Sequence, residues 1–327
     1  MNNMFKNCYN LKGTITLVNG GYVSGTMMNL SSVCENCYNI SGVSFASGAN
    51  RLYLFNNAFR NCYNLTSVGA INNTSYVSDI SNAFRDCTKL TTVPWGWSSA
   101  NCFYAYYNTG ITTAFTGTPS NSINYYYTFG NCKNLTSIGN INGYRYTSLY
   151  YTFSNCTNLT SVSYIQNAYL VGTFEGCNNL TTINSLINIH SADNAFRNCK
   201  NLTEVNQASI NGSCQNVFAS CSNLRYVNYF YANSTSNNAF RDCVNLRQFN
   251  NATTLYYLDN AFRNCSNLTN INLTSSANTY YMQYAFANCT NLKTITMASP
   301  YMWNAAYMCQ GCTSLTDFTI NYVYNST

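Results

Sequence analysis

Apolar residues recur along the chain in the order F-x-x-C-x-x-L-x-x-[IV], with polar residues between them. The pattern is complete at Phe59, Cys62, Leu65 and Val68, and it returns from one end of the chain to the other. Steps of three residues across four apolar positions fit neither one amphipathic helix nor one strand. The pattern therefore predicts a short coil with several inward corners, which becomes stable by stacking on similar coils before and after it.

The number of coils follows from the positions of the motif cysteines. Thirteen cysteines hold this position at intervals of mostly 21 to 25 residues, so we predict about 14 turns if one degenerate turn lies between Cys87 and Cys132. We place that turn on Phe115, with Thr118 replacing the cysteine, inside a longer repeat region at 88–131. The sequence thus predicts a single solenoid over residues 1–327. The motif cysteines are Cys8, Cys37, Cys62, Cys87, Cys132, Cys156, Cys177, Cys199, Cys221, Cys243, Cys265, Cys289 and Cys312.

Each turn divides into three segments. The run from the Leu onwards, for example Leu135, Ile138 and Ile141, predicts a strand of a parallel sheet, and the segment before the Phe predicts a second short strand. The A-F-R-N-C stretch predicts a helical or 3₁₀ turn. Asn, Asp or Gly two residues after the Phe, as at Asn61 and Gly176, suits a left-handed backbone conformation.

An asparagine stands directly before the Leu in eleven turns. Its side-chain amide can pair with groups that a coil leaves without partners, so we predict a ladder of stacked asparagines. These residues are Asn10, Asn39, Asn64, Asn134, Asn158, Asn179, Asn201, Asn223, Asn245, Asn267 and Asn291.

The repeat at residues 57–68, NAFRNCYNLTSV, resembles the BspA-like leucine-rich repeats, whose turns carry A-F-x-x-C followed by x-x-L-T-x-I. The resemblance covers essentially the whole chain and implies a leucine-rich-repeat solenoid. It also implies adhesion, since such repeats form parts of bacterial surface proteins and phage-encoded fibres that bind host glycans, matrix or cells. The segment after the first strand departs from the family pattern and is rich in Asn and Tyr, so we expect a weaker or shorter second strand there.

The composition of the chain limits the classes of partner that it can bind. Only 7% of residues are charged, and the net charge of +6 is spread without a basic run, which disfavours a nucleic-acid partner. No apolar stretch is long enough for a membrane helix, so we expect no membrane insertion, and the first residues show no secretion signal. We expect an extracellular protein, exposed either on a virion or on a bacterial cell surface.

The spacing of some cysteines suggests redox or zinc chemistry, but the repeat explains their positions better. The pairs Cys34 with Cys37 and Cys309 with Cys312 have the spacing of redox or zinc sites. However, Cys34 and Cys309 occupy the Phe position of their turns, and Cys214 an apolar position, so we expect all three inside. His190 is the only histidine, and no acid pair or nucleophile with its base recurs. We therefore predict no metal site, no cofactor and no enzymatic activity.

Aromatic residues in the variable half of each turn are the candidates for ligand binding. The thirty tyrosines of the chain are concentrated there, and two pairs have equal spacing to their Phe, so each pair should stack in adjacent turns and face outward. Stacking that only stabilises the sheet is the alternative interpretation. The candidates are Tyr126 with Tyr150, Tyr257 with Tyr281, Tyr226 and Gln248 on the first strand, and Trp95 and Trp97 in the degenerate region.

Two functions fit these features. The first is a non-enzymatic adhesion or receptor-binding protein that recognises glycans or a host surface protein. The second is a structural solenoid that assembles into a filament or coat by end-to-end packing. Neither end of the repeat shows a polar cap, so we expect self-association or capping of the ends by another chain.

Overall fold

The computed structural model describes residues 1–17, 28–45, 52–70, 76–93, 101–114, 125–253, 255–274, 279–298 and 302–320. They form two compact units. Unit 1 comprises Met1–Gly139 and Gly143–Leu159, and unit 2 comprises Asn140–Asn142 and Thr160–Thr327. Each unit is a parallel β-solenoid of the leucine-rich-repeat type, which confirms the predicted fold class. Within these ranges the chain forms strands and turns but no helix.

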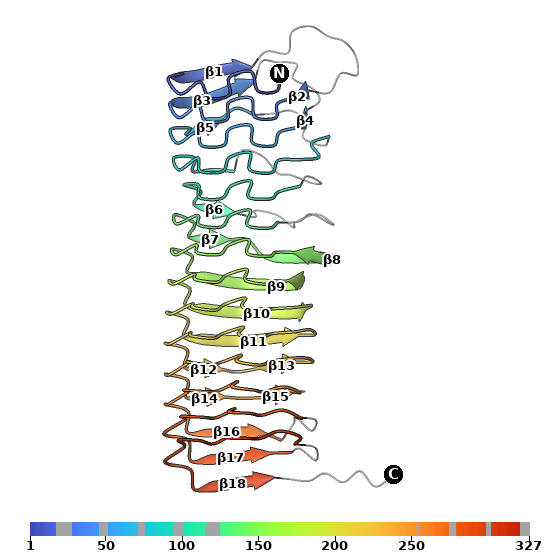
Figure 1. Cartoon of the computed structure of the whole chain (residues 1–327), viewed down its shortest axis with the longest axis vertical. Helices are drawn as coiled ribbons and strands as arrows, with labels where there is room; N and C mark the ends of the chain where they lie inside the picture. Colours follow the sequence, from blue (N-terminus) through green and yellow to red (C-terminus); the bar gives the residue numbers. More distant parts are fainter. Residues whose placement is uncertain are drawn as a thin grey trace. The chain divides into compact units, whose positions relative to one another are not determined.

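Unit 1 carries short strands that pair in parallel (Figure 1). One sheet has the order β1-β3-β5, and two further pairs join β2 to β4 and β6 to β7. Strand β8 (Ile141–Ser148) crosses the boundary between the units. The other strands are β1 (Gly13–Leu17), β2 (Met28–Asn29), β3 (Ile40–Phe45), β4 (Leu52–Leu54), β5 (Ser67–Val68), β6 (Thr113–Ala114) and β7 (Ser137–Ile138).

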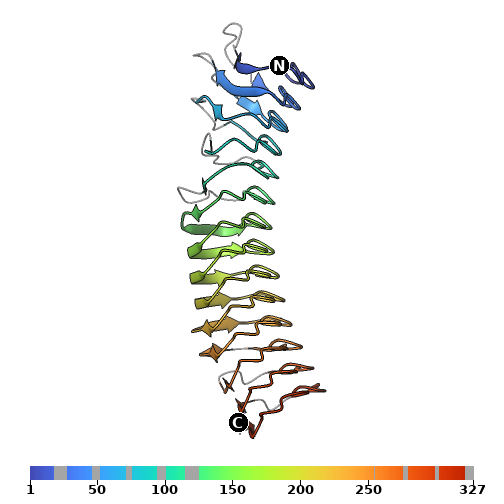
Figure 2. The ribbon, with the colours of Figure 1, turned by 90° about the vertical axis from the view of Figure 1, so that its left-hand side faces the viewer.

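Unit 2 stacks its strands along one side of the turns, as Figure 2 shows. Parallel pairing follows the order β9-β10-β11-β12-β14, β13 bridges β11 and β15, and β16-β17-β18 form a further sheet. The strands are β9 (Ser161–Tyr169), β10 (Thr182–Ile189), β11 (Glu204–Ile210), β12 (Tyr226–Val227), β13 (Phe230–Ala232), β14 (Gln248–Phe249), β15 (Ala252–Thr253), β16 (Asn270–Leu273), β17 (Thr294–Met297) and β18 (Asp317–Ile320).

The second strand before the Phe is short, as the sequence predicted. In unit 1 it exists as the pair β2 and β4. Elsewhere it is reduced to single bridges, such as those that join Thr235 to Tyr257 and Tyr257 to Tyr281. These bridges hold the residues before the Phe in register from turn to turn, although they do not form an extended sheet.

The loop around the Phe is a series of tight turns, so the prediction of a helical or 3₁₀ turn is wrong. The amides of Arg60 and Cys62 donate to carbonyls three residues back, at 3.2 and 3.1 Å. The alternate amides, those of Phe59 and Asn61, donate to the next turn instead, at 2.8 Å to the Ala83 carbonyl and at 2.9 Å to the Arg85 carbonyl. A helix would keep every amide within its own segment. The loop instead alternates between bonds within a turn and bonds between turns.

Two left-handed residues in each loop produce this alternation. The predicted position two after the Phe is confirmed, with φ of 62° at Asn61 and 75° at Gly176. A second position, two before the Phe, was not predicted and has φ of 54° at Asn57 and at Asn82. Asn tolerates this conformation better than most residues, which explains much of the asparagine in the chain.

Phenylalanine and cysteine columns form the core. In unit 2 the buried rings of Phe174, Phe196 and Phe218 stack with centroids 5.1 and 5.4 Å apart. The Cys221 thiol donates to the Phe196 carbonyl of the preceding turn at 3.1 Å, and the same contact recurs along the column. All seventeen cysteines are free thiols. The predicted packing role therefore includes a hydrogen bond that ties each turn to the one before it.

The predicted asparagine ladder is confirmed. The Asn223 amide donates to Asn201 at 3.3 Å, and that of Asn267 donates to Asn245 at 3.0 Å. A second ladder, which the sequence did not predict, runs through the left-handed position after the Phe. There the Asn131 amide donates to Asn108 at 2.8 Å. The two ladders pair side-chain amides along the outer loop of successive turns.

The degenerate turn has a different register from the one predicted. Phe115 and Thr118 lie outside the described residues, and Tyr106 fills the Phe column, 5.3 Å from both Phe84 and Phe129. Thr109 takes the cysteine position, and its hydroxyl lies 3.2 Å from the Cys132 sulfur. The turn is one residue shorter, since the buried Ile111 follows Thr109 by two positions. Gly110 permits this, because a Cβ there would lie 2.5 Å from the Thr88 carbonyl oxygen.

Candidate binding surface

Five aromatic residues from three successive turns lie together on unit 2. We call Tyr256, Tyr257, Tyr280, Tyr281 and Trp303 the aromatic platform. The rings of Tyr257 and Tyr281 stack at 5.3 Å with an interplanar angle of 12°, which confirms the predicted stacking of this pair. Those of Tyr256 and Tyr280 are nearly parallel at 6.1 Å. Trp303 lies 5.1 Å from Tyr280 and 5.8 Å from Tyr281, and so closes the group.

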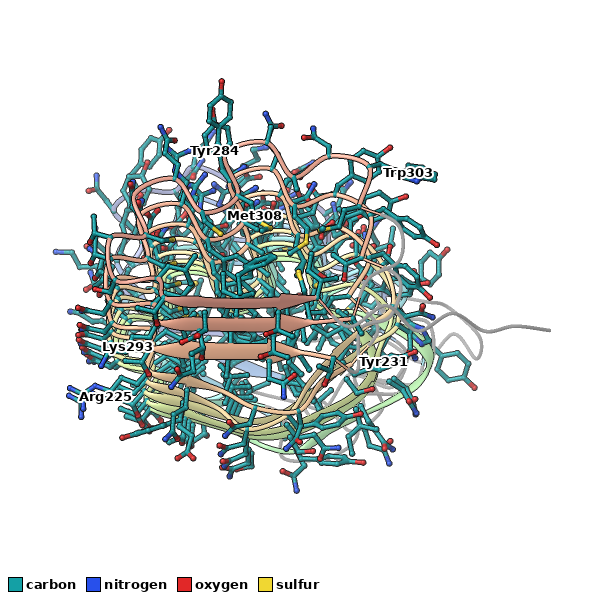
Figure 3. All side chains as sticks on the ribbon, turned by 90° about the horizontal axis from the view of Figure 1, so that it is seen from below. Arg225, Tyr231, Tyr284, Lys293, Trp303 and Met308 are labelled. Atoms are coloured by element: carbon teal, nitrogen blue, oxygen red, sulfur yellow. The ribbon has the colours of Figure 1, made fainter. Side chains whose placement is uncertain are left out.

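The backbone fixes the platform at the surface. Tyr257 and Tyr281 form bridges in register, and the amide of the next residue, Leu258, donates to the Tyr281 carbonyl at 2.7 Å. Leu258 is buried, so its neighbour Tyr257 faces outward and is 38% exposed. Trp303 is 68% exposed, and Figure 3 shows its side chain pointing away from the core. The platform therefore offers ring surface and phenol hydroxyls but no charge.

Tyr126 and Tyr150 are half-buried in unit 1. Tyr126 packs edge-on against Tyr127 at 4.8 Å and against Phe103 at 5.6 Å. The parallel stack in these turns is made one residue later, where Tyr127 lies 5.0 Å from Tyr104 and 4.8 Å from Tyr151, both at 5°. The predicted stacking of Tyr126 on Tyr150 stays a prediction, and the geometry shown for Tyr126 is that of a packing residue.

Tyr226 and Gln248 lie side by side on the sheet of unit 2. They are register partners in β12 and β14, and Tyr226 also pairs with Glu204 in β11. Tyr226 is 36% exposed, and Gln248 is exposed. The arginines directly before them, Arg225 and Arg247, are exposed as well. Sequence reasoning found Tyr226 and Gln248 but did not connect them with these arginines.

The predicted ligand-binding residues Trp95 and Trp97 lie outside the described residues.

Burial and hydrogen bonds affect the cysteines differently. Side-chain hydrogen bonds with Cys34 and Cys309 lower the pKa of Cys37 and of Cys312, respectively. Burial raises the pKa of Cys214 and of Cys221 to about 12, so both stay protonated at neutral pH, whereas the thiolate is the nucleophile and metal ligand. Cys34 is buried in the Phe position, as expected, but Cys309 is only half-buried. Among the residues described, no group of three or more His, Cys, Asp or Glu side chains could hold a metal ion.

The described part of the chain contains no helix that is long and apolar enough to cross a membrane.

Sequence reasoning missed three members of the platform. Tyr256 and Tyr280 stand six residues before the Phe of their turns, and Trp303 stands six before Cys309, which replaces the Phe. This shared offset was a signal that an alignment of the variable segments could have found.

Comparison with known proteins identifies the repeat. A family model for the BspA type leucine rich repeat region matches residues 1–101, 99–225, 147–260 and 233–326. A leucine-rich repeat protein from Bacteroides ovatus has 17% identity and a TM-score of 0.51, over 93% of this chain and 83% of that one. A leucine-rich cell surface protein from Faecalibacterium prausnitzii has 17% identity and a TM-score of 0.47, over 96% and 88%. No curated protein matches the chain. Structural likeness at such low identity shows the fold alone.

Proposed function

The chain belongs to the BspA-type leucine-rich repeat family, and we propose that it is a non-catalytic binding protein of a bacterial cell surface that recognises carbohydrate. The repeat supports a binding role, because stacked turns present long, regular surfaces. The cell-surface location comes from the family resemblance. A virion, the other location that the sequence left open, has no support among the similar structures.

The aromatic platform is the observation that carries the proposal. Its rings lie outside the core columns, yet they occupy three successive turns and remain partly exposed. Tyrosine and tryptophan give large, rigid contacts at small entropic cost and combine an apolar face with a polar group. Sugars match such a surface, since the apolar faces of their rings stack on aromatics and their hydroxyls accept or donate hydrogen bonds. The absence of charge within the platform favours a neutral glycan there.

A glycan array tests the proposal. We expect the wild-type protein to bind neutral glycans and the variant Tyr257→Ala/Tyr281→Ala to bind them at least about tenfold more weakly, a change of about 1.4 kcal/mol or more. The matched control is Tyr38→Ala/Tyr63→Ala, which removes a stacked pair outside the platform, with ring centroids 5.2 Å apart. This control should bind like the wild type.

The opposite result would favour the structural alternative. If the wild-type protein binds no glycan or host surface protein and polymerises spontaneously, the solenoid serves assembly instead.

The continuity of units 1 and 2 as one solenoid over residues 1–327 stays a prediction, supported by the repeat spacing that continues from Cys156 to Cys177.

A further inference from the structure

The residue directly after the motif Leu forms a column along one corner of the solenoid. This corner residue is usually threonine, and the fold gives the reason. The hydroxyl of Thr181 donates to the Thr160 carbonyl of the preceding turn at 3.1 Å, and that of Thr203 donates to the Thr181 carbonyl at 3.0 Å. The same contact recurs in both units, at Thr66, Thr136 and Thr316. Threonine at this corner therefore links successive turns.

Arg225 and Arg247 interrupt the threonine column in two consecutive turns of unit 2. The Arg247 amide donates to the Arg225 carbonyl at 3.0 Å, so their backbones are direct neighbours. Both side chains are exposed, and Figure 3 shows Arg225 pointing outward. Adjacent parallel segments lie about 4.8 Å apart, and like charges directly opposite each other are destabilising. These two turns lack the threonine hydrogen bond, and we expect the paired arginines to lower stability.

The carboxylate in register with Tyr226, that of Glu204, accepts the Asn228 amide at 2.9 Å. Among the residues that the structure describes, neither Arg225 nor Arg247 takes part in an ion pair. Places where a sequence breaks its own local rule without a structural gain are expected at functional sites. Two neighbouring guanidinium groups that form no ion pair among the described residues can attract anions, and their planar donor groups fit carboxylate or sulfate oxygens bidentately.

The neighbouring side chains indicate what kind of anion binds. Tyr226 and Gln248 follow the two arginines and are register partners, so a phenol ring and an amide lie beside the charges. Lys293 holds the same corner position two turns beyond Arg247 and appears on the same side as Arg225 in Figure 3. We propose that Arg225, Tyr226, Arg247 and Gln248 bind the acidic groups of a charged polysaccharide, either uronate carboxylates or sulfates. Such a polymer repeats its charges along its length, as the turns repeat along the unit.

A nucleic acid fits the corner less well. Nucleic-acid sites present a continuous basic stripe, whereas Thr269 separates Arg247 from Lys293 and the neighbouring sheet face carries the Glu204 carboxylate in register with Tyr226. The inference deepens the proposed function by naming a second class of ligand. It uses no residue of the aromatic platform, so each site can fail without the other.

Titration of the full chain with polygalacturonate, heparin and neutral dextran tests this site. We expect polygalacturonate, heparin or both to bind, which distinguishes the two anionic groups, and their affinity to fall as sodium chloride is added. Arg225→Thr/Arg247→Thr should weaken that binding at least about tenfold. The same variant should raise the Tm by about 2 °C, because it restores the threonine bond and removes the repulsion. Loss of binding together with a higher Tm excludes unfolding as the cause.

The control removes the same charge elsewhere. Arg197→Gln/Arg263→Gln lowers the net charge equally on the loop side of unit 2 and should change acidic binding less than about twofold. Equal losses from both double variants would overturn the proposal, because the effect would then come from net charge alone. Unchanged binding in Arg225→Thr/Arg247→Thr, or tighter binding of single-stranded DNA than of either polysaccharide, would also overturn it. Binding of neutral glycans by the platform should persist in every one of these variants.

Discussion

The arginines on the loop side and those at the corner differ in their ion-pair partners. Four arginines directly after the Phe lie near carboxylates, with N to O distances from 3.3 to 3.8 Å, at Arg60, Arg85, Arg197 and Arg241. The corner arginines of unit 2 have no such partner among the described residues, although they lie in adjacent turns. The fifth arginine directly after the Phe, Arg263, lies over the Tyr284 ring instead, with its guanidinium carbon 5.5 Å from the ring centroid. The loop-side arginines therefore have partners within the fold, whereas the corner arginines do not. This difference separates the residues that maintain the solenoid from those available to a ligand.

Raising the pH should destabilise the protein through its buried cysteine column. Burial raises the pKa of Cys132 to about 11 and of Cys221 and Cys289 to about 12, so the folded state holds these protons more tightly than the unfolded state. Their stabilisation is complete below the unfolded pKa, near 8.5 to 9, and is lost as pH rises towards 12. Each thiol contributes about 1.4 kcal/mol per pH unit in that window. Urea unfolding in a reductant at pH 8 and pH 10 should show a steep loss, and equal stabilities would contradict the buried column.

Truncation of the phenylalanine column should give the largest effect of a single substitution. Phe196→Ala removes a fully buried ring stacked between two others and should lower the unfolding free energy by about 3 to 5 kcal/mol. The surface control Tyr226→Ala should change it by less than about 0.5 kcal/mol. Urea denaturation measures both. Similar losses from the two variants would remove the distinction between column and surface.

The asparagine ladder should contribute less. Asn223→Ala breaks contacts at 3.3 Å to Asn201 and at 3.4 Å to Asn245, and we expect a loss of about 1 kcal/mol. Asn250→Ala, at an exposed position outside the ladder, is the control and should stay within about 0.5 kcal/mol of the wild type. If thermal unfolding ranks the two variants in the reverse order, the ladder does not stabilise the loop side.

Removal of a loop-side counter-charge should have the smallest effect. Asp86→Asn deletes the carboxylate 3.4 Å from Arg85 but keeps an oxygen that can accept the Asn108 amide. Because the pair is partly exposed, we expect a change of less than about 1 kcal/mol in the unfolding free energy. A larger loss by chemical denaturation would mean that loop-side ion pairs, and not the apolar columns, carry the fold.

The columns could be predicted from sequence because they repeat. Phe196, Cys221 and Asn223 each occupy a position that returns in most turns, and a returning residue type indicates a shared environment. The tight turns could not be predicted in the same way. Their second left-handed position accepts Asn57 but also Tyr104 and Tyr127, and tyrosine gives no local signal for that conformation.

The candidate site was predicted only in part. Tyr257 and Tyr281 were found because they have the same offset from their Phe, but Trp303 stands before a turn in which Cys309 replaces the Phe. In the degenerate turn Tyr106 replaced the Phe and a residue was lost, so the motif selected Phe115 instead. The unpaired state of Arg225 and Arg247 depends on which carboxylates lie nearby in space, and sequence spacing alone does not define those distances.

A glycan array probed with the wild-type protein and with Arg225→Thr/Arg247→Thr tests most directly the claim that ligands bind the outward-facing residues and not the structural columns. We predict that the wild type binds both neutral and acidic glycans, and that the variant keeps the neutral glycans, loses the acidic ones and unfolds at a slightly higher temperature. A wild-type protein that binds no glycan, or a variant with the same binding profile, would contradict the account.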